Sequence, residues 1–219
     1  VKDNQADLLM KGLIDTKVLL KAVVNSETGI KEKRLLSHVM MASSPNYHKV
    51  LFATDCAMVI SPTLEDKQEI INNALDLTRT LGYNNPKVGI VSAVEKVNPK
   101  IPSTVDAEKL VELKAAGKIG NCLLGGPFAI DNLVSKEAAA HKGITSPIAG
   151  DVDILIFPNI EAANAFYKTI VFLGKAKVCG IVIGAKCPII LTSRADDAQA
   201  KLNSIILGAV YAYGKNINN

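Results

Sequence analysis

One stretch of this sequence combines side chains that bind oxyanions with a local structure that favours anion binding. A short apolar run, Pro188 to Leu191, predicts a buried strand that ends just before Ser193 and Arg194, and a helix should follow with Asp196 and Asp197 in its first turn. Ser193 can donate a hydrogen bond, and the Arg194 guanidinium suits phosphate or carboxylate oxygens. A helix N-terminus adds about 0.3–1 kcal/mol for an anion. The stretch therefore predicts an oxyanion site, although a helix-capping Ser beside a solvated Arg would give the same pattern.

Three further segments follow predicted strands and carry residues that could bind a substrate. In the first, a Lys beside a glycine turn precedes a helix and could reach a phosphate. In the second, paired glycines allow close backbone approach ahead of a helix-capping Asp, and in the third a Glu, an Asn and a Lys share one helix face. Together these segments predict a shared cleft, whereas each helix alone could simply present a solvated polar face. The residues are Lys11 and Thr16; Gly125, Gly126 and Asp131; and Glu161, Asn164 and Lys168.

Strands and helices alternate along the chain, as expected of an α/β protein. Helices between strands imply right-handed βαβ units and a largely parallel sheet, while a Ser-Ser-Pro-Asn turn predicts one antiparallel strand pair. The predicted strands cover residues 6–10, 34–42, 49–54, 87–93, 121–124, 152–157, 178–183 and 188–191. The first predicted helix is capped by Asp15 or Thr16 and carries apolar residues from Val18 to Val23. The other predicted helices cover residues 64–81, 104–116 and 131–141, the stretch from an Asn159 cap to residue 173, and residues 196–213.

Composition argues against several classes of protein. The 219 residues are 48% hydrophobic, which is enough for one large or two modest α/β domains. The net charge is +4, and the basic residues are dispersed among only five Tyr and five Phe, so we expect no nucleic-acid surface. The four cysteines lack CxxC spacing and stand apart from the three histidines, which predicts core thiols, no metal site and a reducing cytoplasm. No apolar run predicts a membrane span.

Several segments together resemble the phosphate acetyl/butyryltransferase family, and its butyryl branch in particular. They are GGPFAIDN, AGDVDILIFPNIEAANAFYK, VIGAKCPIILTSRADD and KLNSI, with MKGLIDT and RLLSHVMM, and the resemblance covers essentially the whole chain. It implies two α/β domains around a deep cleft, as in the isocitrate and isopropylmalate dehydrogenases. The first domain would comprise residues 1–33 and 188–219, and the second residues 34–187. Family chains begin earlier, so we expect an N-terminal part of the first domain to be absent from this sequence.

The resemblance also implies an activity, the reaction acyl-CoA + phosphate ⇌ acyl phosphate + CoA. Butyryl is the expected acyl group, CoA is a substrate, no cofactor is tightly bound, and the chain forms a homodimer or a larger homo-oligomer. We expect direct transfer in a ternary complex, because no Cys has a neighbouring His that would favour an acyl-cysteine. Alternatives are an acetyl- or branched-chain-specific phosphotransacylase and an NAD(P)-dependent dehydrogenase of the same fold. The dehydrogenase would need cofactor contacts and metal carboxylates that the predicted strand ends do not supply.

By the same resemblance, Ser193 and Arg194 bind the reacting phosphate or acyl phosphate. Preorganised donors on a developing oxyanion contribute about 3–4 kcal/mol in comparable sites. The intact Ser-Arg pair also argues against a binding protein built on an inactive transferase fold.

Two charged residues of the family's site do not transfer cleanly to this sequence. The carboxylate that deprotonates the CoA thiol has no ungapped counterpart, since Ala200 stands in its place, and Asp196 or Asp197 is the nearest candidate. Of these, Asp197 is predicted to be catalytic with Ser193 and Arg194. An Arg of the first domain aligns with Lys21, which offers a point charge in place of a planar fork.

Overall fold

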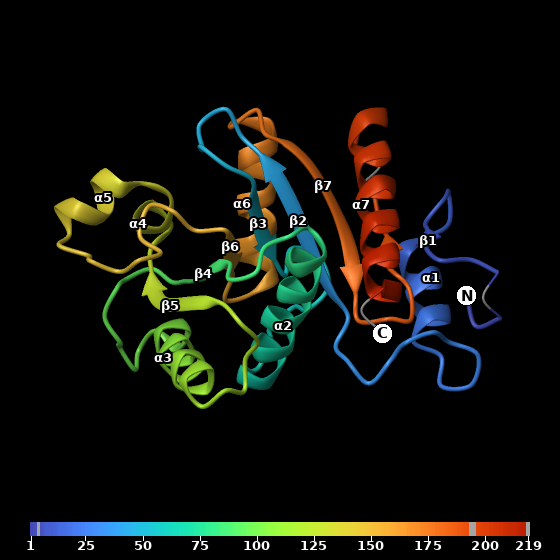
Figure 1. Cartoon of the computed structure of the whole chain (residues 1–219), viewed down its shortest axis with the longest axis horizontal. Coiled ribbons are helices and arrows are strands. Elements are labelled where there is room, and N and C mark those ends of the chain that lie inside the picture. Colours follow the sequence, from blue (N-terminus) through green and yellow to red (C-terminus); the bar gives the residue numbers. More distant parts are fainter. Residues whose placement is uncertain (4, 193–195, 218–219) are drawn as a thin grey trace.

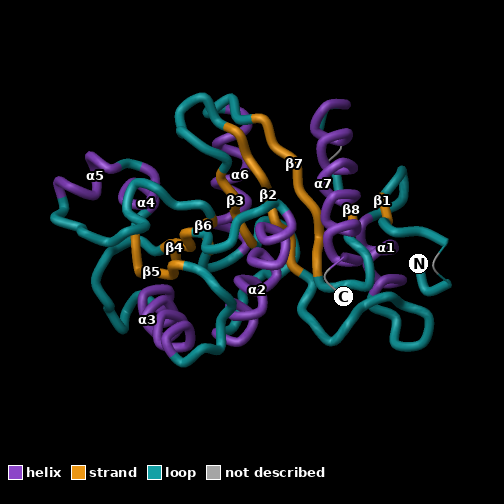
Figure 2. Tube along the Cα trace, in the orientation of Figure 1, coloured by secondary structure: helices purple, strands orange, loops and turns teal. Residues whose placement is uncertain are grey.

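The described part of the chain, residues 1–3, 5–192 and 196–217 of a computed structural model, forms one mixed sheet with helices on both faces (Figure 1, Figure 2). Its strands are β1 (Leu9–Met10), β2 (Ser37–Ser43), β3 (Leu51–Thr54), β4 (Lys87–Val91), β5 (Leu123–Phe128), β6 (Ile154–Ile156), β7 (Lys177–Ile183) and β8 (Ile189–Ile190). Its helices are α1 (Thr16–Val23), α2 (Leu64–Thr80), α3 (Pro102–Ala115), α4 (Ile130–Val134), α5 (Lys136–His141), α6 (Ile160–Phe172) and α7 (Ala198–Ile217). The strands pair in the order β1-β8-β7-β2-β3-β6-β4-β5, which confirms the predicted α/β class.

Antiparallel pairing extends further through the sheet than the sequence predicts. The expected pair of β2 with β3 is confirmed, with Met40 opposite Ala53. However, β7 is also antiparallel to both of its neighbours, β2 and β8. The pairs β1–β8, β3–β6, β4–β6 and β4–β5 are parallel. The sheet is therefore mixed, because β2 and β7 run in opposite directions at its centre.

Side chains of the sheet pack against a different set of helices on each face. Val39 and Met40 are neighbours on β2, both fully buried, and they point to opposite faces because side chains alternate along a strand. Val39 belongs to the core formed with α2, α3 and α7, and Met40 to the core formed with α4 and α6. Helix α1 packs near the β8 end of the sheet, where Val23 contacts a third, smaller apolar cluster. Within the described residues, no helix has the length and apolarity needed to cross a membrane.

Two helices near the site begin at predicted caps: Asp15, one of the two alternatives, for α1, and Asn159 for α6. Asp15 accepts a hydrogen bond from the Lys17 N–H at 2.9 Å and caps α1. Asn159 accepts one from the Ala162 N–H at 2.9 Å and caps α6. Such caps typically contribute about 1 kcal/mol, so these short polar side chains set where both helices begin.

Two predicted element boundaries are wrong. The loop expected at Gly125 and Gly126, after a strand ending at residue 124, lies inside β5, where a Cβ on Gly125 would come within 2.9 Å of Ile148 Cδ1. These glycines therefore lack side chains because neighbouring side chains of the protein pack directly against their backbone. The helix expected over 131–141 divides into α4 and α5, because Ser135 has an extended backbone and caps α5 by accepting from the Ala138 N–H.

The first and last segments of the chain meet at one edge of the sheet. Leu9 of β1 pairs with Ile189 of β8, and α7 follows β8 along the same side of the molecule (Figure 1). The two segments assigned to the first domain, 1–33 and 188–219, therefore lie together in their described parts. The division into two domains stays a prediction, since the strands form one continuous sheet.

A group of charges joins the β2–β3 connection to the loop before β6. Asp151 pairs with Lys87, with His48 Nε2 at 2.7 Å and with Lys49 Nζ at 3.0 Å. Partial burial alone would raise the pKa of Asp151, but hydrogen bonds from these three side chains outweigh it and hold the pKa well below its usual value. The carboxylate therefore stabilises the folded chain in its charged form.

Replacing Asp151 with Asn should lower the free energy of unfolding by about 1 kcal/mol at pH 7, because the Lys49 and Lys87 ammonium groups lose their common carboxylate and His48 loses its acceptor. A depressed folded-state pKa gives stability that is present above the ordinary value of 3.8 and is lost as the pH falls further. Urea unfolding of Asp151→Asn at pH 7 and pH 3 should therefore show a smaller difference from wild type at pH 3. Glu108→Gln, on the exposed face of α3, is the control and should unfold like wild type. Equal stability of Asp151→Asn and wild type at pH 7 would contradict the expectation.

Candidate functional site

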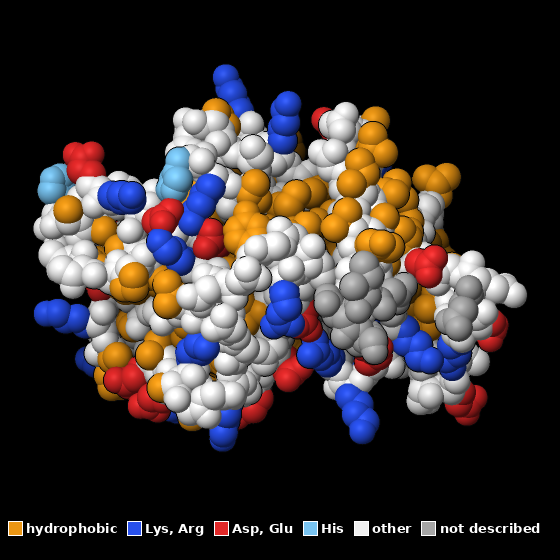
Figure 3. Space-filling model, viewed as in Figure 1, with side chains coloured by type: hydrophobic (Ala, Val, Ile, Leu, Met, Phe, Trp, Pro, Cys, Tyr) orange, Lys and Arg blue, Asp and Glu red, His pale blue; other side chains and the backbone are white. Residues whose placement is uncertain are grey.

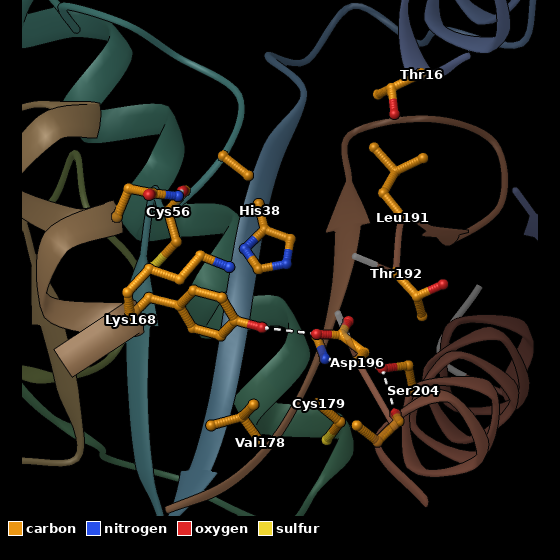
Figure 4. A pocket seen from close by; sticks show the side chains of 15 residues that line it. Thr16, His38, Cys56, Lys168, Val178, Cys179, Leu191, Thr192, Asp196 and Ser204 are labelled. Carbon is orange, nitrogen blue, oxygen red and sulfur yellow. Dashed lines mark hydrogen bonds between the residues drawn. The ribbon is translucent and has the colours of Figure 1, made fainter. Parts of the chain in front are cut away.

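A pocket of about 230 Å³ lies beside β7, between α6 and α7 (Figure 4). It forms there because β8 is short and pairs with β7 only at Val182 in the described structure, which leaves the earlier part of β7 with a free edge. Helix α7 covers this edge, where the Gly180 N–H donates to Ser204 Oγ at 3.2 Å. Ser204 Oγ donates in turn to the Ala200 carbonyl at 2.9 Å, so both polar groups are satisfied.

Residues from six separate parts of the chain line this pocket. The side chains of α6 enter from one side and those of α7 from the other, with His38 of β2 between them (Figure 4). The lining thus combines residues from both predicted domains. The polar members are Thr16, His38, Asn164, Tyr167, Lys168, Thr192, Asp196 and Ser204, and the apolar and thiol members include Cys56, Ala57, Val178, Cys179 and Leu191.

Three residues predicted from the sequence meet in this pocket, although they lie far apart along the chain. Thr16 comes from the start of α1, and Asn164 and Lys168 come from one face of α6. Asn164 also has a structural contact, because its Nδ2 donates to the Cys56 carbonyl at 3.2 Å. Lys168 Nζ lies 4.4 Å from the centroid of the Tyr167 ring.

Ser193 and Arg194, the pair on which the sequence prediction depends most, lie outside the described residues. The residues on either side of this interval, Thr192 and Asp196, both line the pocket. Asp197 caps α7, because its Oδ1 accepts from the Ala200 N–H at 2.7 Å. Ala200, at the position where the family's carboxylate would align, itself lines the pocket.

The other predicted binding residues are not brought to this pocket. Lys11 Nζ donates to the carbonyls of Gly12 and Ile14, both at 3.3 Å, and Lys21 is exposed in the last turn of α1. Asp131 pairs with Lys142 at 3.2 Å near the β5 end of the sheet. Gly125 and Gly126 lie in β5 itself, the edge strand opposite β1. The expected contribution of residues 125–131 to the same cleft is therefore absent from the described geometry.

His38 is a pocket residue that sequence reasoning missed. Burial, and secondarily the charge of Lys168, lower the pKa of His38 to about 4, so the ring is neutral at physiological pH. Its Nδ1 is enclosed and has no hydrogen-bond partner among the described residues. An unsatisfied buried polar atom of this kind costs about 1–3 kcal/mol. The available signal was a His inside an otherwise apolar strand pattern.

A tight turn after β3 holds another part of the pocket wall. The Asp55 carboxylate accepts from the N–H groups of Ala57 and Met58 at 2.9 Å and of Val59 at 3.1 Å. Burial raises the pKa of Asp55 to about 6, and these hydrogen bonds offset only part of that rise. The carboxylate therefore organises the turn that presents Cys56 and Ala57 to the pocket.

The cysteines of the pocket are protonated at neutral pH. Burial raises the pKa of the Cys56 thiol, and it raises that of Cys179 to about 11. All four cysteines of the chain are free and buried. The described residues contain no cluster of three or more His, Cys, Asp or Glu side chains that could hold a metal ion. Neither pocket thiol thus has the thiolate character that nucleophilic catalysis requires.

Similarity to known proteins identifies the class of this chain, an acyltransferase with an α/β fold. Residues 1–209 match the family described as "Phosphate acetyl/butaryl transferase". The chain is 44% identical to the phosphate butyryltransferase of Clostridium beijerinckii over 212 residues, which cover 97% of this chain and 70% of that protein. It is also 44% identical to the phosphate acetyltransferase of Thermotoga maritima over 212 residues, which cover 97% and 72% of the two chains.

A solved structure gives the same result. The crystal structure of a branched-chain phosphotransacylase from Enterococcus faecalis V583 superposes with a TM-score of 0.87 at 40% identity, covering 95% of this chain and 75% of that one. The chain belongs to the phosphate acetyl/butyryltransferase family. The predicted enzyme class, an acyltransferase of the phosphotransacylase type, is confirmed, and the dehydrogenase alternative is not favoured.

The fit of His38 against β7 depends on Gly180, which makes this glycine a test of the pocket geometry. A Cβ at Gly180 would lie 2.6 Å from His38 Nε2 and 3.0 Å from the Val39 carbonyl oxygen. Gly180→Ala should therefore lower the free energy of unfolding by about 1–3 kcal/mol, as overpacking does. Urea unfolding followed by circular dichroism measures the change.

Gly12→Ala is the matched control, since an added Cβ there meets no atom within 4 Å. At such sites the change from Gly to Ala is neutral or stabilises by about 0.4–1 kcal/mol. A Gly180→Ala protein as stable as Gly12→Ala would mean that His38 does not pack against β7 in this way.

Proposed function

We propose that this chain catalyses butyryl-CoA + phosphate ⇌ butyryl phosphate + CoA, with CoA as a substrate and no tightly bound cofactor. Membership of the family supports the reaction type. The reaction is assigned to this pocket because the junction of β8 with α7 opens onto it. The residues that flank this junction, Thr192 and Asp196, line the same pocket as Lys168, so an anion bound at the junction would meet that ammonium.

The two kinds of lining suit the two parts of an acyl phosphate. Lys168, Thr16 and Thr192 supply a positive charge and hydroxyl donors for phosphoryl oxygens. Val178 and Leu191 supply apolar contacts for a short hydrocarbon chain. We assign the phosphoryl group to the first set and the acyl chain to the second.

In the proposed mechanism, Ser193 and Arg194 bind the reacting phosphoryl group, and the CoA sulfur and phosphate exchange directly at the acyl carbonyl. The protein contributes mainly position and charge. Ionising a CoA thiol of pKa about 8.5 completely would gain roughly 30-fold at pH 7, or about 2 kcal/mol. Donors on the developing oxyanion contribute about 3–4 kcal/mol, so they outweigh a general base such as Asp197.

Relatives with butyryl, acetyl and branched-chain names have similar identities to this chain, so the acyl group is a separate part of the proposal. The quoted motifs favour butyryl. We also propose a homo-oligomer, a homodimer or larger, in the cytoplasm, where free cysteines persist. Figure 3 shows hydrophobic side chains along α7, a surface of the kind that oligomers bury. Its exposed members are Leu202, Ile206, Val210 and Tyr213.

The purified chain should release free thiol from butyryl-CoA only when phosphate is present, and more slowly from acetyl-CoA and isobutyryl-CoA. Arg194→Ala should lower kcat/KM by at least about 100-fold, because the oxyanion loses its bidentate donor. A thiol-reactive dye follows the reaction continuously.

Arg79→Ala is the matched control, since Arg79 lies on α2, half-exposed and paired with Asp76. It should keep wild-type kinetics. Arg194→Ala activity within fivefold of wild type would remove the guanidinium from the mechanism, and phosphate-independent thiol release would refute the reaction itself.

Direct transfer predicts that neither pocket cysteine carries the acyl group. Cys56→Ser and Cys179→Ser should both retain kcat within about fivefold of wild type, because both thiols are protonated at neutral pH. Acid-quenched wild-type protein should show no added butyryl mass on incubation with butyryl-CoA. Loss of activity in one variant, together with an acyl adduct on that residue in wild type, would establish a covalent route instead.

A further inference from the structure

His38 has no role in the mechanism above, yet its ring stands at the centre of the pocket. It lies on β2 opposite Val182 of β7, between two residues, Ser37 and Val39, that are completely buried. Alternation along the strand turns the His38 ring to the face opposite Val39, toward α6. A polar ring at this position is therefore built into the pocket by the sheet itself.

Two features fix the ring and leave one of its nitrogens unused. Gly180 lacks the Cβ that would clash with Nε2 and Cε1, so the ring packs closely on the β7 backbone. Nδ1 is enclosed, and no described residue hydrogen-bonds to it. A buried acceptor of this kind is available to a side chain or a ligand that moves into place beside it.

Lys168 is the pocket side chain that can supply a hydrogen-bond donor to Nδ1. Its ammonium and the His38 ring point toward one another in the pocket (Figure 4). In the structure the ammonium rests over the Tyr167 ring, a contact that leaves its three N–H groups available for oxygen or nitrogen acceptors. The flexible four-carbon stem allows a small shift from the Tyr167 ring to the imidazole.

We propose that His38 is a positioning residue of this site: when a phosphoryl group binds, His38 Nδ1 accepts a hydrogen bond from Lys168 and holds the ammonium against the phosphoryl oxygens. One N–H of Lys168 then bonds the imidazole, and two remain for the anion. The arrangement requires the His38 proton on Nε2. The inference rests on the proposed function, because it takes the bound anion to be the reacting phosphoryl group.

The surroundings keep the imidazole able to accept. Only a neutral ring offers a lone pair, and a protonated ring would repel Lys168. Burial and Lys168 keep the pKa of His38 near 4, so the acceptor form persists at physiological pH. The titratable groups that surround the ring are Asp55 and Cys56 after β3, Tyr167 and Lys168 on α6, Cys179 on β7 and Asp196 just before α7.

Kinetics of the purified chain test the pair first. His38→Leu should raise the KM for phosphate at least tenfold at pH 7.5 and change the KM for butyryl-CoA less than threefold. His38→Asn, whose Oδ1 can replace Nδ1 as an acceptor, should recover most of that loss. In a Lys168→Met background, His38→Leu should add no more than a twofold effect, since the shared interaction is already gone. Full additivity of the two substitutions would overturn the proposal, and His141→Asn, on exposed α5, is the control with wild-type kinetics.

Proton NMR of the histidine rings gives a second readout that needs no turnover and no change at His38. The chain has only three histidines, so their ring signals are readily assigned. One ring should titrate near pH 4 in wild type, and Lys168→Met should move that midpoint upward because a repelling charge is lost. Saturating inorganic phosphate should shift this ring signal in wild type and leave it unchanged in Lys168→Met.

The outcomes separate this inference from the proposed function. An equal phosphate response in Lys168→Met would mean that the ligand itself contacts His38, which overturns the role of Lys168. No response in wild type would overturn the pair altogether. A phosphate response that depends on Lys168, in a chain that releases no thiol from any acyl-CoA, would refute the proposed reaction while keeping the His38–Lys168 interaction.

Discussion

The hydrogen bond from the Gly180 N–H to Ser204 Oγ is the contact on which the pocket depends. A free strand edge exposes backbone groups that must find partners, and here the partner is a helix side chain. Because Ser204 of α7 accepts the hydrogen bond of the Gly180 N–H, no strand is needed beside this part of β7. Space therefore remains between α7 and α6. The same arrangement brings the junction of β8 with α7 next to Lys168. The site thus follows from how one sheet edge is closed.

Low polarity around this space determines the protonation states within it. The environment lowers the pKa of His38 to about 4, raises that of Asp55 to about 6, and keeps the Cys56 and Cys179 thiols protonated. In the described lining, Lys168 supplies the one ammonium and Asp196 the one acidic side chain, among otherwise uncharged side chains. The electrostatic interaction between a bound phosphoryl group and the Lys168 ammonium is therefore strong, since little solvent is present to screen it. This favours an enzyme that positions and stabilises anions over one that attacks them with its own nucleophile.

The glycines quoted in the family resemblance illustrate how one motif can serve the fold. Gly125 and Gly126 follow the pattern expected of a loop that approaches a ligand, yet both lie in β5. A Cβ on Gly125 would meet Ile148, and one on Gly126 would come within 2.7 Å of Ile90 Cβ. Close packing between β4, β5 and the loop before β6 explains these residues without a substrate. Motif resemblance identified the family correctly, while the geometry separated its structural glycines from the pocket.

Local signals in the sequence were sufficient for the α/β class, most helix starts and the family. Asp15 and Asn159 cap helices through contacts within three residues, so the sequence alone determines where α1 and α6 begin. The antiparallel pairing of β2 with β7 and the place of His38 were decided by tertiary structure, because they join residues more than 130 positions apart. The Gly180–Ser204 contact depends on how α7 packs against the sheet. Periodicity and capping describe neighbours along the chain, whereas pocket geometry and protonation arise from surroundings that exist only after folding.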